Sequence, residues 1–378
     1  MAELPRRLFL GAAGAAAAVG ATSLAGLTSA QAARCKGRVF YVGSYTSPGA
    51  PVGHGLDVTT TSNGPALTLD HTVSGVSDAS WFAFSPDGRI LFSTNEGVPD
   101  GHVTSLDVRD PAKPRKISTQ PSRGSAPTHL CVHPSGRYLL TANYGTGSVV
   151  VHPIARDGRL GASTDLVVHH GAERDAHAHQ VVVDPSGRWV LSVDLGADSV
   201  YVYSLDLKTG KLKQHQQLVL PSGAGPRHLA FHPNGRFAYI AQELRPEVTV
   251  ATWDAAAGKL AAGAVVPAVD ASSPGPNYPG EIEVSADGRF AYVSVRGENT
   301  VATFAVKDGG LERLGANATT GGDWPRHLVL DPGQRGAYVS NQNSGTVTWL
   351  PRDTASGKLG APQRVFAVPS VATVAFRH

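Results

Sequence analysis

The chain has 378 residues, with 43 glycines, 26 prolines and a formal net charge of +3. The charges form no basic stripe, which argues against binding to nucleic acid. Glycine and proline separate short runs of strand-forming residues, and no long stretch with helical periodicity follows residue 33. This composition predicts an all-β protein with many turns.

The first 33 residues are typical of an export signal. Arg6 and Arg7 precede an uncharged run rich in alanine and glycine, and a small-residue cleavage site (AQA) follows at 30–32. Paired arginines before such a run indicate a twin-arginine signal peptide. We therefore predict that residues 1–33 are cleaved and that 34–378 form an extracellular, periplasmic or cell-wall-associated protein. The alternative is an uncleaved anchor, because the run is long enough to span a bilayer, but its low hydrophobicity argues against a stable membrane anchor.

The two cysteines, Cys35 and Cys131, are too few for a disulfide framework. They could pair with each other in an oxidising compartment. Cys131 also fits an apolar strand pattern, in which cysteine behaves as a small buried residue. The sequence leaves this pairing open.

One turn sequence recurs six times along the rest of the chain. Most copies read Pro, then Asp, Asn or Ser, then Gly and Arg, which is typical of a tight hairpin. Ala286 replaces the proline in the fifth copy. Two apolar runs flank each turn, and two more follow before the next copy, so each unit has four strands in about 49 residues, typical of a propeller blade. The turns lie at 85–89, 133–137, 184–188, 232–236, 285–289 and 331–335.

The two ends of the repeat region complete one further blade. Residues 39–42 match the strand that follows the turn in other units, and residues 371–376 match the strand that precedes it. Pairing of these ends would close the ring and remove the open sheet edges that invite aggregation. The sequence therefore predicts a seven-bladed β-propeller at 34–378, with four-stranded antiparallel blades and a closing blade shared by both termini. We expect a closed propeller of this kind to be a monomer.

The hairpin register predicts which side chains meet at one end of the central channel. The first strand of a blade lines the channel, so its first residues and those just after the second strand converge opposite the turn. Ligand sites form where a few polar groups converge in this way. The rings contain Ser80, Trp81, Thr128, His129, His179, Gln180, Arg227, His228, Glu281, Arg326 and His327 before the turns, and Asn95, Glu96, Asn143, Tyr144, Asp194, Glu243, Arg296, Asn341 and Gln342 after them, while the closing blade adds Tyr45.

Several ring residues have a purely structural alternative. Asn143 and Asn341 could cap strand ends, and His327 could form hydrogen bonds between blades. A structural role is less favoured for Arg227 and Arg296, because two guanidiniums beside one carboxylate are costly to bury without a functional reason.

A metal site is a further alternative. His177 and His179 alternate along one predicted strand, so both could face one ion. No cysteine and no second carboxylate is forced nearby. We therefore predict neither a metal nor a cofactor.

Several short motifs occur together in one known family. The segment GPRHLAFHP at 225–233 is followed by QEL at 242–244, with ANYG at 142–145 and WPRH at 324–327. As a set these motifs resemble the lactonase family of seven-bladed propellers, and the resemblance extends from residue 38 to 378. The family includes the propeller-type bacterial 6-phosphogluconolactonases and the fungal enzyme that lactonises 3-carboxy-cis,cis-muconate.

The resemblance implies four catalytic residues, and each position holds the matching residue type: His179, Arg227, Glu243 and Arg296. Val295 departs from the family, which often has asparagine before its second arginine. The export signal is the larger departure, because the pentose-phosphate substrate is cytoplasmic. The candidates for contact with a substrate are Tyr45, Asn143, Tyr144, His177, Asp194, His228, Arg326, His327, Asn341 and Gln342.

Opening a lactone requires an activated water and stabilisation of a tetrahedral oxyanion. Glu243 or His179 would serve as the general base, and Arg227 and Arg296 would bind substrate oxygens and the developing negative charge. The expected partner is a small lactone or carboxylate, and the scheme needs no metal. The alternatives are a muconate-type cycloisomerase that moves a proton at carbon, and a non-catalytic propeller that binds a ligand or protein.

Overall fold

The computed structural model describes residues 38–47, 51–62 and 64–377. Every regular element among these residues is a β-strand, and this part of the chain contains no helix long and apolar enough to cross a membrane. The signal peptide predicted at 1–33 and Cys35 lie outside the described residues. Cys131 lies half-buried in an inner strand and packs against a hydrophobic cluster.

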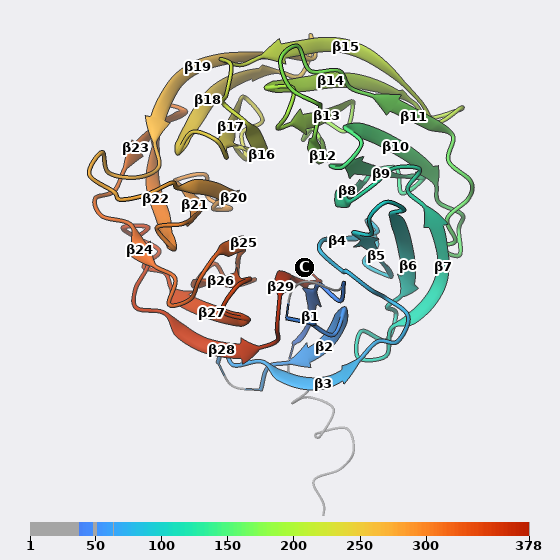
Figure 1. The fold of residues 1–378 in the computed structure, drawn as a ribbon, viewed down its shortest axis with the longest axis horizontal. Coiled ribbons are helices and arrows are strands. Elements are labelled where there is room, and N and C mark those ends of the chain that lie inside the picture. Colours follow the sequence, from blue (N-terminus) through green and yellow to red (C-terminus); the bar gives the residue numbers. More distant parts are fainter. Residues whose placement is uncertain (1–37, 48–50, 63, 378) are drawn as a thin grey trace, which may run out of the picture. The chain divides into compact units, whose positions relative to one another are not determined.

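Seven antiparallel sheets surround one axis, which confirms the predicted seven-bladed propeller (Figure 1). In Figure 1 the strands β4, β8, β12, β16, β20, β25 and β29 are the innermost of their blades. From the axis outward, the first three blades are Phe82–Phe84, Ile90–Asn95, His102–Asp107 and Arg115–Pro121 (β4 to β7); Pro127–Val132, Tyr138–Asn143, Ser148–Pro153 and Asp165–Val168 (β8 to β11); and Ala178–Val183, Trp189–Asp194, Ser199–Asp206 and Lys211–Val219 (β12 to β15).

The next three blades have the same order. They are Pro226–Phe231, Phe237–Gln242, Glu247–Asp254 and Lys259–Pro267 (β16 to β19); Tyr278–Val284, Phe290–Arg296, Thr300–Lys307 and Gly310–Arg313 (β20 to β23); and Pro325–Leu330, Gly336–Asn341, Thr346–Pro351 and Gln363–Ala367 (β25 to β28). One departure from the prediction is the short strand Ala318–Thr319 (β24), which pairs with β22 and gives that blade a fifth strand.

The closing blade is built from both ends of the described chain. Its strands are Val371–Phe376 (β29), Val39–Ser44 (β1), Leu56–Thr60 (β2) and Thr68–Thr72 (β3). β29 pairs antiparallel with β1, with Val374 opposite Val42. The shared seventh blade predicted from the sequence is therefore confirmed.

The recurring turns connect the two inner strands of six blades. In the first of these turns the Gly88 N–H donates to the Ser85 carbonyl (2.8 Å). Five turn glycines have φ between +66° and +72°, a conformation that residues with a side chain adopt only at a cost. The sixth turn has Gln334 at +55° instead.

The hydrophobic core lies between neighbouring blades. Leu191 of one blade belongs to the same buried cluster as Leu229 and Ile240 of the next, and burial of each such side chain contributes about 1.5–3 kcal/mol. A tyrosine hydroxyl adds a link between blades, since Tyr239 donates to the Gly309 carbonyl (3.1 Å). These contacts hold the inner strands in fixed positions around the axis.

A β-bulge interrupts the innermost strand of several blades at one equivalent position. In β16 the pairing with β17 shifts between Pro226 and His228, which leaves Arg227 between them unpaired. A bulge adds one residue and changes the direction of its side chain. The residues at this position in four blades are Thr128, His179, Arg227 and Arg326.

Candidate active site

Three of the bulged residues, and residues at the ends of several second strands, surround one polar cavity, and the fourth bulged residue, Arg227, lies beside it against Glu243. The cavity has a volume of about 210 Å³. Because these residues lie far from the recurring turns along their strands, the cavity lies at the opposite end of the blades. Its wall contains Glu96, Thr128, Tyr144, His179, Glu243, Arg296 and Arg326.

Glu243 lies between two buried arginines at this cavity. Its Oε2 is 2.7 Å from Arg296 Nη2 and 3.1 Å from Arg227 Nε. Arg296 also donates to the carbonyls of Tyr278 (3.2 Å) and Pro279 (3.0 Å). Burial alone would raise the pKa of Glu243, but the charges of Arg296 and Arg227 outweigh it and lower the pKa. Glu243 is therefore an ionised group that holds both guanidiniums.

Arg227 has hydrogen-bonding capacity that the fold does not use. Its side chain is 2% exposed, and its Nη1 has no hydrogen-bond partner among the described residues. Burial and the like charges of Arg296 and Arg326 lower the pKa of Arg227 to about 9, which leaves it cationic at neutral pH. A buried donor without a partner costs about 1–3 kcal/mol, and an oxygen of a bound ligand would remove that cost.

A second carboxylate belongs to the same cavity wall. Glu96 Oε2 accepts a hydrogen bond from the Tyr45 hydroxyl (2.9 Å) and lies 3.7 Å from Arg326 Nη2. The Arg326 guanidinium is 5.5 Å from the centre of the Tyr45 ring. Gln342 lies half-buried, and its Oε1 has no partner in the part of the chain that the structure describes. Together with Arg227 and Arg296, Arg326 gives the site three guanidiniums against two carboxylates.

Tyr144 and His177 form a stacked pair beside the cavity. Their ring centres are 4.5 Å apart, and His177 Nδ1 donates to the Tyr144 carbonyl (2.9 Å). Tyr144 borders the cavity, so His177 supports a wall residue. Among residues 38–47, 51–62 and 64–377, no group of three or more His, Cys, Asp or Glu side chains is arranged to hold a metal ion.

Aromatic rings pack closely behind His179. Trp81 is 4.1 Å from His129 and 5.1 Å from His327, measured between ring centres. Burial lowers the pKa of His327 to about 4, so this ring is neutral. The space left here, bordered also by His228, is only about 10 Å³. His228 and His327, both candidates for substrate contact, therefore lie in a packed layer behind the cavity.

Asn143, Asp194 and Asn341 use their side chains within the fold. Asn143 Nδ2 donates to the Ser122 carbonyl (3.0 Å) and Asn341 Nδ2 to Thr348 Oγ1 (3.1 Å). Each of the three ends a second strand, and none of them borders the cavity, whereas Tyr144, the residue after Asn143, does. In the structure these three side chains stabilise the strand ends, and their contact with a substrate stays a prediction.

Replacing Asp194 by alanine is expected to lower the free energy of unfolding by about 3–5 kcal/mol, the scale for breaking a buried charged network. Its carboxylate accepts hydrogen bonds from the backbone N–H groups of His177 and Ala197 and from His169 Nδ1, each at 2.8 Å. Denaturant unfolding measures this loss. Asp157→Ala, at an exposed site, is the control, and equal stability of the two variants would contradict the assignment.

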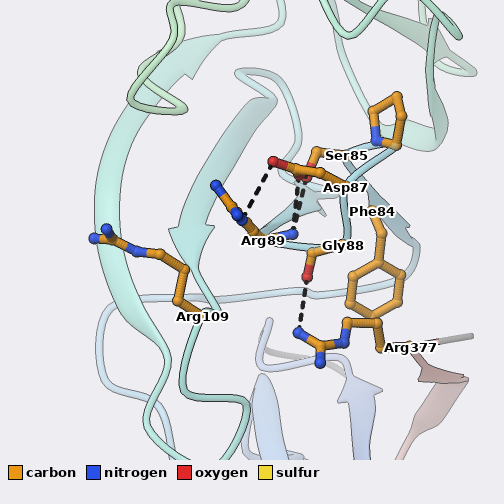
Figure 2. Close-up of a pocket in the computed structure, with 8 residues that line it drawn as sticks. Phe84, Ser85, Asp87, Gly88, Arg89, Arg109 and Arg377 are labelled. Atoms are coloured by element: carbon orange, nitrogen blue, oxygen red, sulfur yellow. Dashed lines mark hydrogen bonds and ion pairs between the residues drawn. The ribbon is translucent and has the colours of Figure 1, made fainter.

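A larger cavity of about 870 Å³ lies at the turn end of the blades (Figure 2). Arg377 donates there to the Gly88 carbonyl (3.4 Å). Arg89 lies 3.7 Å from Asp87 and is 67% exposed. Exposed ion pairs of this kind contribute little in water. The smaller cavity, whose charged side chains are largely buried, is therefore the candidate active site.

The fold and the buried charged cavity together define a class of protein. The chain matches the family described as Lactonase, 7-bladed beta-propeller, over residues 39–376, and it belongs to this family. It is 30% identical to 6-phosphogluconolactonase of Bacillus subtilis over 345 residues, which cover 89% of this chain and 98% of that protein.

Solved structures of other proteins have a similar fold. The chain is similar to the periplasmic gluconolactonase of Pseudomonas aeruginosa, with a TM-score of 0.82 and 31% identity over 90% of this chain and 98% of the other. It is also similar to a protein from Lactobacillus plantarum, with a TM-score of 0.83 and 32% identity over 91% and 100% of the two chains.

Two wall residues, Glu96 and Thr128, are missing from the site proposed from the sequence. Both occupy ring positions in the repeat, so the hairpin register contained the signal. Of the two, Glu96 matters more for the electrostatics of the site, because its negative charge lies 3.7 Å from the guanidinium of Arg326.

Proposed function

We propose that this chain is an exported, monomeric lactonase that hydrolyses a sugar lactone in the cavity around Glu243. The observation that carries the proposal is the pairing of one ionised carboxylate with two buried guanidiniums beside His179. A buried Nη1 of Arg227 without a partner among the described residues is suited to an oxygen that becomes negatively charged. Membership of the lactonase family supports the same activity.

His179 is the better of the two candidate bases. Glu243 is bound by two guanidiniums, which lower its pKa and make it a weak base. His179 Nδ1 is hydrogen-bonded to His228 (3.1 Å), whereas His179 Nε2 has no hydrogen bond to any described residue. Burial, Arg227 and His228 lower the pKa of His179, so its neutral ring can accept a proton from water.

The reaction then follows from these positions. Water attacks the lactone carbonyl carbon while its proton passes to His179 Nε2, and the carbonyl oxygen becomes an oxyanion. Arg227 and Arg296 stabilise that charge, and because both guanidiniums are buried the interaction is stronger than it would be in water. The ring C–O bond breaks, and its oxygen takes the proton as the hydroxyl of the free acid.

The substrate is proposed to be an unphosphorylated sugar lactone found outside the cytoplasm. The export signal predicted at 1–33 favours such a substrate, and a relative of known structure is named a periplasmic gluconolactonase. The rival substrate is a phosphorylated lactone, because a relative is named 6-phosphogluconolactonase. Fractionation of cells that produce the full chain tests the export step separately.

We expect the purified chain to hydrolyse D-glucono-δ-lactone well above the spontaneous rate, with turnover unchanged by EDTA. The panel also contains 6-phosphogluconolactone, an aliphatic lactone and 3-carboxy-cis,cis-muconate, each followed by pH-stat or ultraviolet absorbance. Faster turnover of the phosphorylated lactone would overturn the substrate assignment, and loss of turnover with EDTA would overturn the metal-free scheme. Cyclisation of the muconate alone would indicate a cycloisomerase, and no turnover of any compound would indicate a binding protein.

A further inference from the structure

Three buried side chains from three consecutive blades form one line of hydrogen bonds. Glu281 Oε1 is 2.9 Å from His228 Nδ1, and His228 Nε2 is 3.1 Å from His179 Nδ1. They come from β20, β16 and β12, and all three residues are buried. The line starts at Glu281, which does not border the cavity, and ends at His179, which does.

The chemistry of imidazole fixes the direction of these hydrogen bonds. A neutral imidazole has one N–H donor and one acceptor nitrogen. If ionised Glu281 accepts from His228 Nδ1, then His228 Nε2 must accept from His179 Nδ1. His179 Nε2 is then the nitrogen with the lone pair. The carboxylate therefore sets the tautomer of a ring two hydrogen bonds away.

The surroundings keep both rings neutral. Burial lowers the pKa of His179 and of His228, and the charge of Arg227 lowers both further. Burial raises the pKa of Glu281, although His327 and Arg227 partly oppose this. Among these three groups, the carboxylate is therefore where a proton rests at the lowest cost.

We propose that Glu281 and His228 are positioning residues that form a proton relay behind His179, with Glu281 as the final acceptor. This inference depends on the proposed hydrolysis. In the attack step one proton moves from water to His179 Nε2, one from His179 Nδ1 to His228 Nε2, and one from His228 Nδ1 to Glu281. Water loses one proton, Glu281 gains one, and both rings stay neutral. When the ring C–O bond breaks, the three protons move back in the opposite direction, and His179 Nε2 gives its proton to the leaving ring oxygen.

The proposed relay compensates for the low basicity that His179 would have as a single general base. A ring with a strongly lowered pKa is a weak base, because its protonated form would be a buried cation near Arg227. When the proton is transferred to Glu281 instead, a carboxylate is neutralised and no buried cation forms. Trp81 packs against this line, with its ring centre 5.4 Å from that of His228.

Glu281→Gln tests proton acceptance separately from the tautomer. The Ile282 N–H donates to Glu281 Oε1 (3.1 Å), so the amide oxygen is expected to occupy that position and still accept from His228. The variant keeps the hydrogen bonds but cannot take a proton. We expect kcat for the lactone to fall by about 100-fold or more, with KM changed less than about twofold, as for a group that acts only in the transition state.

Glu283→Gln is the matched control. Glu283 lies two residues further along β20, accepts from the Leu330 N–H (2.7 Å) and has its pKa raised to about 8 by burial, but it is not part of the line. We expect its kcat to stay within about twofold of the wild-type value. An unchanged kcat in Glu281→Gln, or an equal fall in Glu283→Gln, would overturn the relay.

Nitrogen-15 NMR of histidine-labelled chain gives a test that does not depend on activity. The His179 signals are assigned by comparison with His179→Gln, and His228→Gln serves as a second break in the line. We expect Nδ1 of His179 to be protonated and Nε2 unprotonated in the wild type, and this preference to persist in Glu281→Gln and to be lost in His228→Gln. A proton on Nε2 in the wild type would overturn the relay even if lactones are hydrolysed. Absence of lactone turnover with the expected tautomer would instead contradict the proposed hydrolysis.

Discussion

Arg227→Ala is expected to lower the turnover of the preferred lactone by about 100- to 1,000-fold, the loss typical for removal of one oxyanion donor. Arg227 lies at a β-bulge with its Nε 3.1 Å from Glu243, a cavity-wall residue, and its Nη1 has no partner among the described residues. The substitution also leaves Glu243 with a single guanidinium partner. Steady-state kinetics on the folded variant, checked by circular dichroism, measure the effect.

Two further arginine variants sharpen the result. Arg227→Lys keeps a positive charge but loses the planar pair of donors, so most of the loss is expected to persist. Arg109→Ala, at the turn end of the blades, is expected to keep wild-type turnover. Wild-type activity in Arg227→Ala would remove the oxyanion role from this site.

His179→Gln is expected to lower turnover by about 100- to 10,000-fold, the range for loss of a general base. The pH profile gives an independent signature. Burial and the neighbouring Arg227 and His228 hold the pKa of His179 well below 6.5. His179 is active when unprotonated, so kcat/KM should stay level as the pH falls through 6.5 and decline only at lower pH.

The control for this prediction is a histidine far from the site. His71→Gln, on the outer strand β3, should leave both the rate and the pH profile unchanged. A wild-type profile that already declines at pH 6.5 or above would show that the group titrating is not the buried ring. Full activity of His179→Gln would show that His179 is not the general base.

The repeat made the blade number predictable. Each turn needs a residue that tolerates positive φ, and Gly88 and its equivalents mark that position in five of the six turns. The matching end segments 39–42 and 371–376 supplied the seventh blade. β24 was not predicted, because a two-residue strand carries too few side chains to form a pattern.

The site was predictable in outline but not in detail. The register brought His179, Glu243 and Arg296 to one end of the blades because all turns share one phase. It could not tell which of two adjacent ring residues faces the cavity, so Asn143 and Tyr144 were given the same role. For Asn143 and Tyr144 the end of β9 decides this; for the first strands the bulges decide it, and a bulge without a glycine leaves no mark in the sequence.

The hydrogen bonds that link Glu281, His228 and His179 could not be predicted from the sequence for a different reason. His228 and Glu281 were placed in the same ring by their distance from the turn. The distance from the turn orders residues along the channel axis. It contains no information on which side chains of neighbouring blades come within hydrogen-bonding distance. The contact between His228 and His179 depends on how adjacent blades pack.

A crystal structure of the chain with D-gluconate, the expected product, tests the central claim most directly. The account predicts the carboxylate within hydrogen-bonding distance of Arg227 and Arg296, with His179 Nε2 facing the same group. Gluconate seated instead in the cavity beside Arg377 at the turn end, with the Glu243 cavity free of it, would contradict the account.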